Sequence, residues 1–426
     1  YFFFFFTSGK LSLSISGTDL DAYVDTLSPA ALTPFTTYKN KSTEANYIAN
    51  YTVSSKINSR HFIKIGATYQ TIYFNANSKV YHSEYGKYVD QLNVKSSTAG
   101  LVQGFMHWQF RPAERITLNT GLHYQNFLLN NSSALEPRLG ASFKLSPKQA
   151  VNIGYGMHSQ MQPVIYYFYS AYDPIANTYN VSNRNLKLSN SQHAILSYDY
   201  NFAKDFRLKL ESYYQYLYNV PVEKYHSSSF SMINVGNALE GIPLVDSLEN
   251  TGHGKNYGAE LTIEKFFSKH YYFLSTISVY QSKYRGSDGV EHSTSYDGGY
   301  VWNALGGYEF SLGEKKNKFI SLDLKYTQAG GNRYTPIDLE QSNLKGKAVY
   351  VDALAFSKKQ KDYSRFDVKL SYKTNRKKTS QIIFITVENI FDTQNILRES
   401  YNAKLKNTQK EYQLGLFPYG GYRIEF

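Results

Sequence analysis

Residues 411–426 read EYQLGLFPYGGYRIEF and end on an aromatic residue. In an extended strand, successive side chains point to opposite faces, so this stretch predicts one apolar face and one polar face. The apolar face comprises Tyr412, Leu414, Leu416, Tyr422, Ile424 and Phe426, and the polar face comprises Glu411, Gln413, Arg423 and Glu425. In a soluble sheet the apolar face would pack on a core. In a membrane barrel it would contact lipid, while the polar face would meet water.

The composition favours strands over helices. The 426 residues include 41 Tyr and 27 Phe, and aromatic residues suit both strands and the girdles of membrane barrels. The sequence contains no run of about 18 apolar residues, which predicts that it has no transmembrane helix. The absence of Cys excludes disulfide bonds, thiolate nucleophiles and cysteine metal sites.

The net charge of +12 raises the question of a polyanionic partner. A nucleic-acid-binding surface requires clustered basic residues, whereas the Lys and Arg residues here are scattered between expected strands and loops. We therefore expect no nucleic-acid partner and interpret most of the charge as belonging to a solvated lumen and solvated loops. The alternative is a funnel that attracts anionic ligands.

Short turns alternate with long connections along the chain. We expect a first strand over 1–7 and a long polar connection over 8–44, then seven pairs of strands around short turns: 46–57 and 61–74, 101–110 and 115–127, 138–145 and 150–157, 194–202 and 206–218, 257–266 and 271–283, 302–312 and 319–328, 365–374 and 381–390. With the closing strand the count is about sixteen, each long enough to cross a bilayer when tilted.

This pattern predicts an all-β fold, a transmembrane antiparallel barrel that occupies residues 1–426. If Phe426 lies in the periplasm, every short turn is periplasmic and every long loop is extracellular, which is the asymmetry of outer-membrane barrels. The alternative, a soluble all-β array, gives no reason for short and long connections to separate so regularly.

Several stretches resemble the C-terminal barrel of TonB-dependent outer-membrane receptors, in particular the Bacteroidetes type that carries a carboxypeptidase-regulatory-like domain at its N-terminus. Residues 136–147 (EPRLGASFKLSP) are similar to a hairpin of the family, followed by 153–156 (IGYG). Residues 183–188 (NRNLKL) resemble the family's NPDLKPE without its Pro and acid, 257–261 (YGAEL) resemble a strand start, and 387–392 (VENIFD) resemble NLFD. The similarity extends from about Ala45 onward, and the terminal Phe also fits bacterial outer-membrane barrels.

The resemblance implies a receptor in the bacterial outer membrane that imports a scarce, large ligand, namely a siderophore, cobalamin, a glycan or a peptide. Barrels of the family have 22 strands, so about six strands, the plug and the TonB box would lie outside this chain. The implied partners are the lipid bilayer, the TonB complex through the missing N-terminal part, a possible surface lipoprotein, and the barrel assembly machinery, which would read Tyr422, Ile424 and Phe426. No cofactor is implied.

Two groups of residues are candidates for contact with the ligand. The first group is aromatic and lies in the connection 158–192: Tyr166, Tyr167, Tyr169, Tyr172 and Tyr179. Aromatic faces supply affinity at such sites, although these residues would equally suit an interfacial girdle or loop packing. The second group is cationic and faces the expected lumen: Arg207, Lys209, Arg365 and Lys369. These cations would attract an anionic complex, or would instead form salt bridges with Glu211, Asp367, Asp323 or Glu260.

We predict that the protein is not an enzyme and binds no metal. The ten His residues are dispersed, and the sequence contains neither an HExxH pair nor a GxSxG elbow. The remaining alternative is a passive porin or an adhesin, a barrel without a plug, which an even strand count near sixteen would also fit.

Overall fold

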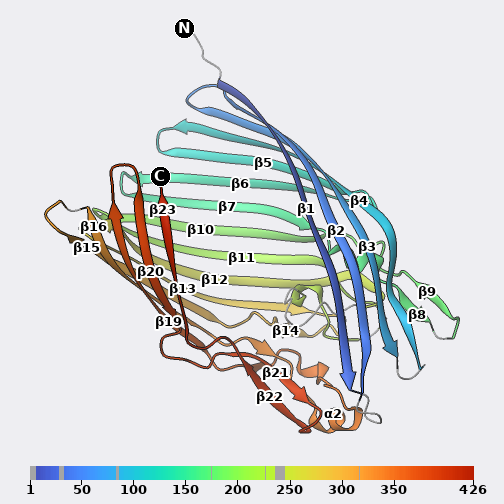
Figure 1. Cartoon of the computed structure of the whole chain (residues 1–426). Coiled ribbons are helices and arrows are strands. Elements are labelled where there is room, and N and C mark those ends of the chain that lie inside the picture. The colour runs from blue at the N-terminus through green and yellow to red at the C-terminus, as the bar shows by residue number, and fades with distance from the viewer. Residues whose placement is uncertain are drawn as a thin grey trace.

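The computed structural model describes residues 6–27, 33–82, 86–173, 175–225, 227–235, 245–315 and 317–426. One antiparallel sheet of seventeen strands dominates it, and Figure 1 shows that this sheet curls strongly around a central space. The strands are β1 (Phe6–Leu27), β2 (Pro34–Lys56), β3 (His61–His82), β4 (Lys87–Ala113), β5 (Ile116–Phe127), β6 (Ser132–Ser146), β7 (Gln149–Gln160), β10 (Ser189–Ala203), β11 (Phe206–Glu223), β12 (Leu248–Ser268), β13 (Tyr271–Arg285), β14 (Glu291–Ser293), β15 (Tyr300–Leu312), β16 (Lys318–Ala329), β19 (Tyr363–Asn375), β20 (Ser380–Glu388) and β23 (Phe417–Glu425).

Neighbouring strands of the wall follow one another along the chain, and each pair is antiparallel. All seven predicted hairpins are present, and the predicted count of about sixteen strands is confirmed, because β14 is a three-residue strand beside β13. Among the described residues, β1 pairs only with β2 and β23 pairs only with β20. The sheet of this chain therefore has two edges, β1 and β23.

The prediction of a polar connection over 8–44 is wrong. Residues 8–27 belong to β1 and residues 34–44 belong to β2, and the two strands pair with Ser16 opposite Asn46 and Leu20 opposite Ser42. Residues 28–32 lie outside the described residues. In the first half of β1, Leu11, Leu13 and Ile15 alternate with Ser12, Ser14 and Ser16 rather than with charged residues, and serine is common in loops as well. Residues 1–5, where the first strand was expected to begin, lie outside the described residues.

The prediction of one strand over 411–426 is also wrong. β22 (Asn407–Tyr412) pairs with β21 (Ile396–Asn402) in a separate two-stranded sheet, and the closing wall strand β23 begins only at Phe417. Between them, a Cβ at Gly415 would lie 2.4 Å from the carboxylate of Asp392, which accepts a hydrogen bond from the backbone of Leu416. The chain turns here because the loop holds it through backbone contacts that apolar alternation does not reveal.

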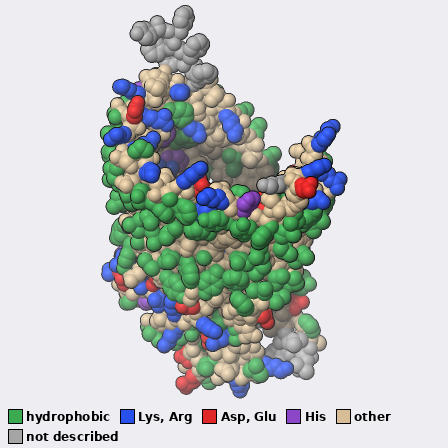
Figure 2. Space-filling view, turned by 90° about the vertical axis from the view of Figure 1, so that its left-hand side faces the viewer, with side chains coloured by type: hydrophobic (Ala, Val, Ile, Leu, Met, Phe, Trp, Pro, Cys, Tyr) green, Lys and Arg blue, Asp and Glu red, His purple; other side chains and the backbone are tan. Residues whose placement is uncertain are grey.

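Apolar side chains alternate on the outer face of the wall. On β11, Leu210 and Tyr214 are about half exposed, while Lys209 and Glu211 on either side of Leu210 point to the inner face. Figure 2 shows a band of hydrophobic side chains across the middle of one face, with Lys and Arg gathered above and below it. This is the arrangement of a barrel wall that meets lipid on its outside and water within.

The described part of the chain contains no helix that is long and apolar enough to cross a membrane.

The long loops form a packed cluster at the end of the wall opposite the short turns. Their small elements are α1 (Val164–Phe168), β8 (Ala171–Asp173), β9 (Thr178–Asn180), η1 (Met232–Asn234), β17 (Arg333–Tyr334), α2 (Leu339–Lys345), η3 (Asp352–Leu354) and β18 (Lys358–Lys359). The buried core lies here, where α1 packs against the far ends of β3 and β4 through Phe74, Leu92 and Phe168. The loops over this part of the lumen are therefore ordered by their own hydrophobic core.

Candidate functional site in the barrel lumen

A line of uncharged polar side chains crosses the inner face of the wall. His193, Gln215, Asn256 and Ser282 occupy directly paired positions on β10, β11, β12 and β13. Gln215 Nε2 donates to His193 Nε2 at 3.0 Å, Asn256 Nδ2 donates to Gln215 Oε1 at 2.7 Å, and Ser282 Oγ donates to Asn256 Oδ1 at 2.6 Å. Thr294 Oγ1 extends the line by donating to Ser282 Oγ at 2.8 Å. Register alone brings these side chains together, because they come from four separate strands.

Two tyrosines lie in the next row toward the short turns. Tyr213 on β11 and Tyr280 on β13 flank Gly258 on β12, since Gly258 pairs with both. A Cβ at Gly258 would lie 2.5 Å from the carbonyl oxygen of Val279 and 3.0 Å from the Tyr213 hydroxyl. Only glycine therefore lets both rings lie against β12.

A cavity of about 570 Å³ lies over these two rows. Its walls include the Tyr213 and Tyr280 rings together with Gln215 and Asn256, and the loops contribute Met232 and Tyr296. Every described residue that lines it is uncharged. Its volume falls within the range of about 300–1,000 Å³ that is typical of sites for small ligands.

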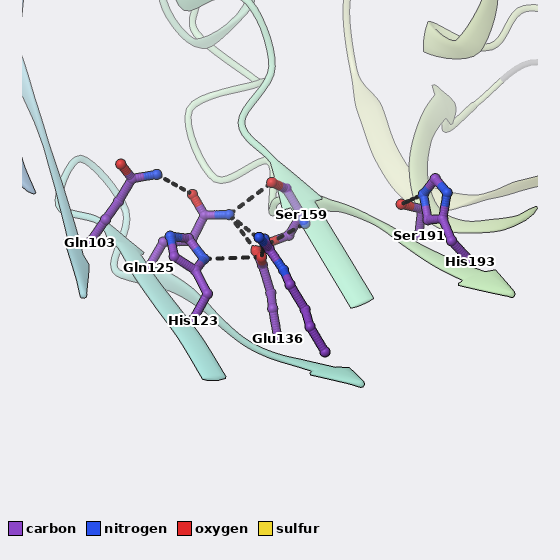
Figure 3. Close-up of polar contacts among 8 residues, drawn as sticks. Gln103, His123, Gln125, Glu136, Ser159, Ser191 and His193 are labelled. Carbon is purple, nitrogen blue, oxygen red and sulfur yellow. Dashed lines mark hydrogen bonds and ion pairs between the residues drawn. The ribbon is translucent and has the colours of Figure 1, made fainter. Parts of the chain in front are cut away.

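A buried carboxylate organises the adjoining part of the wall (Figure 3). Glu136 on β6 is 2% exposed and accepts hydrogen bonds from four side chains and one backbone amide. Arg138 donates at 2.8 Å, His123 Nδ1 lies at 3.0 Å, and Gln125 Nε2 donates at 2.8 Å. Ser159 donates twice, from its backbone N–H at 3.0 Å and from its hydroxyl at 2.5 Å. This density of donors satisfies the charge of a carboxylate that water does not reach.

The Glu136 cluster adjoins the cavity. Ser159 is followed directly by Gln160, Met161 and Gln162, which form part of the cavity rim. His158, beside Ser159, packs its ring edge-on against His193 with centroids 4.9 Å apart. Glu136 therefore fixes the position of the segment that borders the cavity, and the two clusters form one continuous polar surface on the inner wall.

The structure places two of the predicted ligand-binding tyrosines inside the loop core. Tyr166 and Tyr167 belong to α1 and are 0% exposed. The Tyr167 ring lies 4.9 Å from that of Phe127. Burial raises the pKa of Tyr167 to about 12, although the hydrogen bond from the Gln162 backbone N–H to its hydroxyl acts in the opposite direction. These side chains pack the outer loops in this structure, and their contact with a ligand stays a prediction.

The other three predicted tyrosines lie further out on the loops. Tyr169 is partly buried, and burial and nearby Asp246 raise its pKa. Tyr172 and Tyr179 face each other across the β8–β9 hairpin with ring centroids 5.3 Å apart, and Lys87 Nζ donates to the Tyr172 hydroxyl at 2.7 Å. None of the five predicted tyrosines is among the described residues that line the cavity.

Three of the four predicted lumen cations form salt bridges with carboxylates. Arg207 Nε donates to Asp199 at 3.0 Å, Lys209 Nζ lies 2.5 Å from Glu211, and Arg365 Nε donates to Asp367 at 2.7 Å. Lys369 Nζ lies 5.1 Å from the centroid of the Phe384 ring. Asp323 and Glu260, the other suggested salt-bridge partners, accept hydrogen bonds from Tyr272 and Ser278. The first three cations are thus neutralised by nearby acids.

The sequence did not single out the residues that surround the cavity. The YGAEL stretch that contains Gly258 entered only as a resemblance to a strand start. The signal that would have found them is the combination of strand parity with hairpin register, which brings Tyr213, Gly258 and Tyr280 together in one row.

Over the described ranges, no group of three or more His, Asp or Glu residues is arranged to hold a metal ion.

Comparisons with known proteins agree with this architecture. Residues 3–390 match the family described as "TonB dependent receptor-like, beta-barrel", and the chain belongs to this family of outer-membrane transport proteins, which are not enzymes. Comparison with curated protein sequences gave no match.

Solved structures of similar fold include the ferric yersiniabactin uptake receptor FyuA from Yersinia pestis, at 13% identity and a TM-score of 0.67, with 98% of this chain and 58% of that chain covered. The ferripyoverdine receptor of the outer membrane of Pseudomonas aeruginosa matches at 12% identity and a TM-score of 0.61, covering 98% and 54%. The copper transporter OprC matches at 11% identity and a TM-score of 0.63, with 99% of this chain and 62% of that chain covered. At these identities the likeness establishes the fold alone. The chain spans between 54% and 62% of the length of these three relatives.

Proposed function

We propose that this chain is the barrel of a receptor in the bacterial outer membrane that imports a scarce, large ligand with energy supplied through TonB. The observation that carries the proposal is the cavity on the inner face of the wall, beneath ordered outer loops and beside a buried polar cluster. A receptor needs an ordered outer site, because a dilute solute enters too slowly by passive diffusion, whereas a pore needs only an open lumen.

The proposal includes several parts that lie outside this chain. Residues 1–426 would form the C-terminal part of a 22-stranded barrel, and the edges of β1 and β23 support this, since a membrane-spanning sheet has to close. The missing parts would supply a plug, a TonB box and a carboxypeptidase-regulatory-like domain of the Bacteroidetes type. A surface lipoprotein is a further candidate partner at the outer loops.

The closing strand would be the contact for the barrel assembly machinery. Tyr422 is well exposed and Ile424 is partly exposed on the outer face of β23, and Phe426 just beyond the strand is also well exposed. The assembly machinery could contact such exposed side chains before the strand is inserted into the membrane.

The similar structures are named for different ligands. FyuA and the Pseudomonas receptor are named for ferric chelates, and OprC is named for copper. Siderophores, cobalamin, glycans and peptides are the classes that we consider for this chain, because one scaffold can serve different ligands.

The experiment that tests the proposal compares ligand accumulation by cells that carry the full-length receptor, with and without TonB. We expect accumulation only when TonB is present. The rival proposal is a passive porin or an adhesin. Equal accumulation in both strains, together with a native polypeptide mass near the 48.8 kDa of this chain, would favour that rival. A larger mass would leave room for the plug and TonB box.

A further inference from the structure

We propose that the lumen cavity takes an uncharged ligand that combines an apolar ring face with hydroxyl or amide groups, of which a neutral saccharide and an amide-rich macrocycle are the two sources, and that it does not take an anionic ferric chelate. This inference rests on the proposed function and names the ligand chemistry of the same site.

The cavity combines aromatic rings with amide groups. The Tyr213, Tyr280 and Tyr296 rings supply flat apolar faces, while Gln215 and Asn256 supply amide donors and acceptors. Aromatic faces with a few well-placed polar groups are the usual means of holding and orienting a neutral ligand.

Polar groups in the cavity still have unused hydrogen-bonding capacity. Within the described part of the chain, the hydroxyls of Tyr213 and Tyr296 have no hydrogen-bond partner. Asn256 Nδ2 uses only one of its two hydrogens, in the bond to Gln215. A ligand with hydroxyl or amide groups would satisfy these atoms, which a purely apolar ligand would leave unpaired at a cost in affinity.

The charges around the cavity disfavour an anionic ligand. No cation lines the cavity among the described residues, and the next row of the wall toward the short turns carries Glu211 directly opposite Glu260. Lys209, in the row beyond, is already bound to Glu211 at 2.5 Å. An anionic chelate would lose its hydration here without gaining a countercharge, and it would be repelled by Glu260, which forms no ion pair with any described residue. The cavity therefore selects against anions.

The test is a binding measurement on the purified full-length receptor in detergent, by isothermal titration. The probes are maltohexaose, cellohexaose and xylohexaose as neutral saccharides, cyanocobalamin as an uncharged amide-rich macrocycle, and the ferric tris-catecholate trianion as an anionic chelate. We expect a neutral probe to bind and the trianion not to bind. Whether the saccharides or cyanocobalamin bind identifies the source.

Variants locate the binding. We expect Tyr213→Ala and Tyr280→Ala to weaken binding of the neutral probe by about tenfold or more, and Tyr213→Phe to weaken it less than Tyr213→Ala, because it keeps the ring and removes only the hydroxyl. Tyr214→Ala is the matched control, because Tyr214 is the next residue on the same strand and faces outward. Heat-modifiable migration on gels confirms that each variant is folded.

Three results would overturn the inference: failure of every neutral probe to bind, neutral binding that Tyr213→Ala leaves unchanged, or binding of the trianion that Tyr213→Ala weakens. These results are separable from the proposed function. TonB-dependent uptake of an anionic chelate that Tyr213→Ala does not affect would keep the import function and reject this ligand class. Neutral binding without any TonB-dependent uptake would do the reverse.

Discussion

Glu136 Oε1 accepts two hydrogen bonds from Ser159, one from the backbone N–H at 3.0 Å and one from the hydroxyl at 2.5 Å. Glu136 lies on β6, and Ser159 lies at the end of β7, where the chain leaves the wall for the outer loops. The bond therefore ties a loop that borders the cavity to a buried charge on the wall. Arg138 and His123 also contact this carboxylate. A substitution of Glu136 should therefore disturb the contacts of all three residues.

We expect Glu136→Gln to loosen the segment 159–163 without unfolding the wall. Gln cannot accept all five bonds, and its amide hydrogens would face the donors Arg138 and His123. Hydrogen exchange should become at least tenfold faster in 159–163, which corresponds to about 1.4 kcal/mol of lost local stability. Mass spectrometry of peptic fragments measures this, with Glu114→Gln in an exposed short turn as the control. Unchanged exchange in 159–163 would contradict the role of Glu136.

The pair Arg365 and Asp367 gives a prediction for the stability of the wall. Asp367 is 8% exposed and accepts from Arg365 Nε at 2.7 Å, from a second guanidinium nitrogen at 2.9 Å, and from the backbone N–H of Asn389 at 2.9 Å. We expect Arg365→Lys to lower the unfolding free energy by about 1–3 kcal/mol, because Lys cannot form the two-pronged contact and leaves part of a buried carboxylate unpaired.

Urea unfolding of the refolded receptor in detergent measures this effect. Lys369→Met is the control, because Lys369 lies beside the Phe384 ring and forms no salt bridge within the described ranges. If Arg365→Lys and Lys369→Met have the same stability, the Arg365–Asp367 contact contributes nothing beyond a surface ion pair.

Strand alternation predicted the wall because every wall strand places one face in lipid and the other in the lumen. It worked where the polar face is charged, as with Lys209 and Glu211 on either side of Leu210. It failed over β1, where Ser12, Ser14 and Ser16 alternate with the apolar side chains, since serine is equally common in loops. Alternation in the sequence thus indicates which side chains contact lipid, but it does not show which strands pair with each other.

The cavity was beyond sequence reasoning for a different reason. Asn256 lies 41 residues from Gln215 and 26 from Ser282 along the chain. Their contact depends on the pairing of β12 with β11 across a long connection and with β13 across a short turn. The aromatic loop was also ambiguous: tyrosines serve buried packing and ligand binding alike. Only the structure separates Tyr166, which is buried in α1, from Tyr296, which borders the cavity.

Asp297 gives a prediction for pH. This outer-loop carboxylate is 3% exposed and meets Lys283 Nζ at 3.0 Å, Arg333 Nε at 3.3 Å and the Ser282 backbone N–H at 3.1 Å. Burial raises its pKa, but the hydrogen bonds from Lys283, Ser293 and Ser282 outweigh burial, so the pKa lies below the usual Asp value. A lowered folded-state pKa stabilises the loop above the unfolded-state pKa, and this stabilisation is lost as pH falls through the folded-state pKa.

Protection of residues 294–299 from hydrogen exchange, corrected for intrinsic rates, should therefore hold between pH 7 and pH 5 and fall below about pH 4. Asp297→Asn should reduce protection at neutral pH and remove most of this pH dependence, because it removes the titrating group. Asp205→Asn in a short turn is the control, since Asn tolerates the positive φ of that position. Retention of the full pH response in Asp297→Asn would assign it to another group.

The last prediction concerns assembly. Phe426 is 97% exposed and lies just beyond β23, whose outer face carries Tyr422 and Ile424. Because the Phe426 side chain packs against almost nothing, Phe426→Ala should leave the unfolding free energy of assembled protein within about 0.5 kcal/mol of wild type. If the closing strand is read by the assembly machinery, the amount of folded receptor in the outer membrane should nevertheless fall several-fold. Heat-modifiable bands in outer-membrane fractions measure the folded amount, and urea unfolding measures the stability of what assembles. Phe391→Ala is the matched control, because Phe391 is 73% exposed in an outer loop. A normal folded amount for Phe426→Ala, or an equal loss for Phe391→Ala, would mean that the terminal aromatic residue carries no assembly signal.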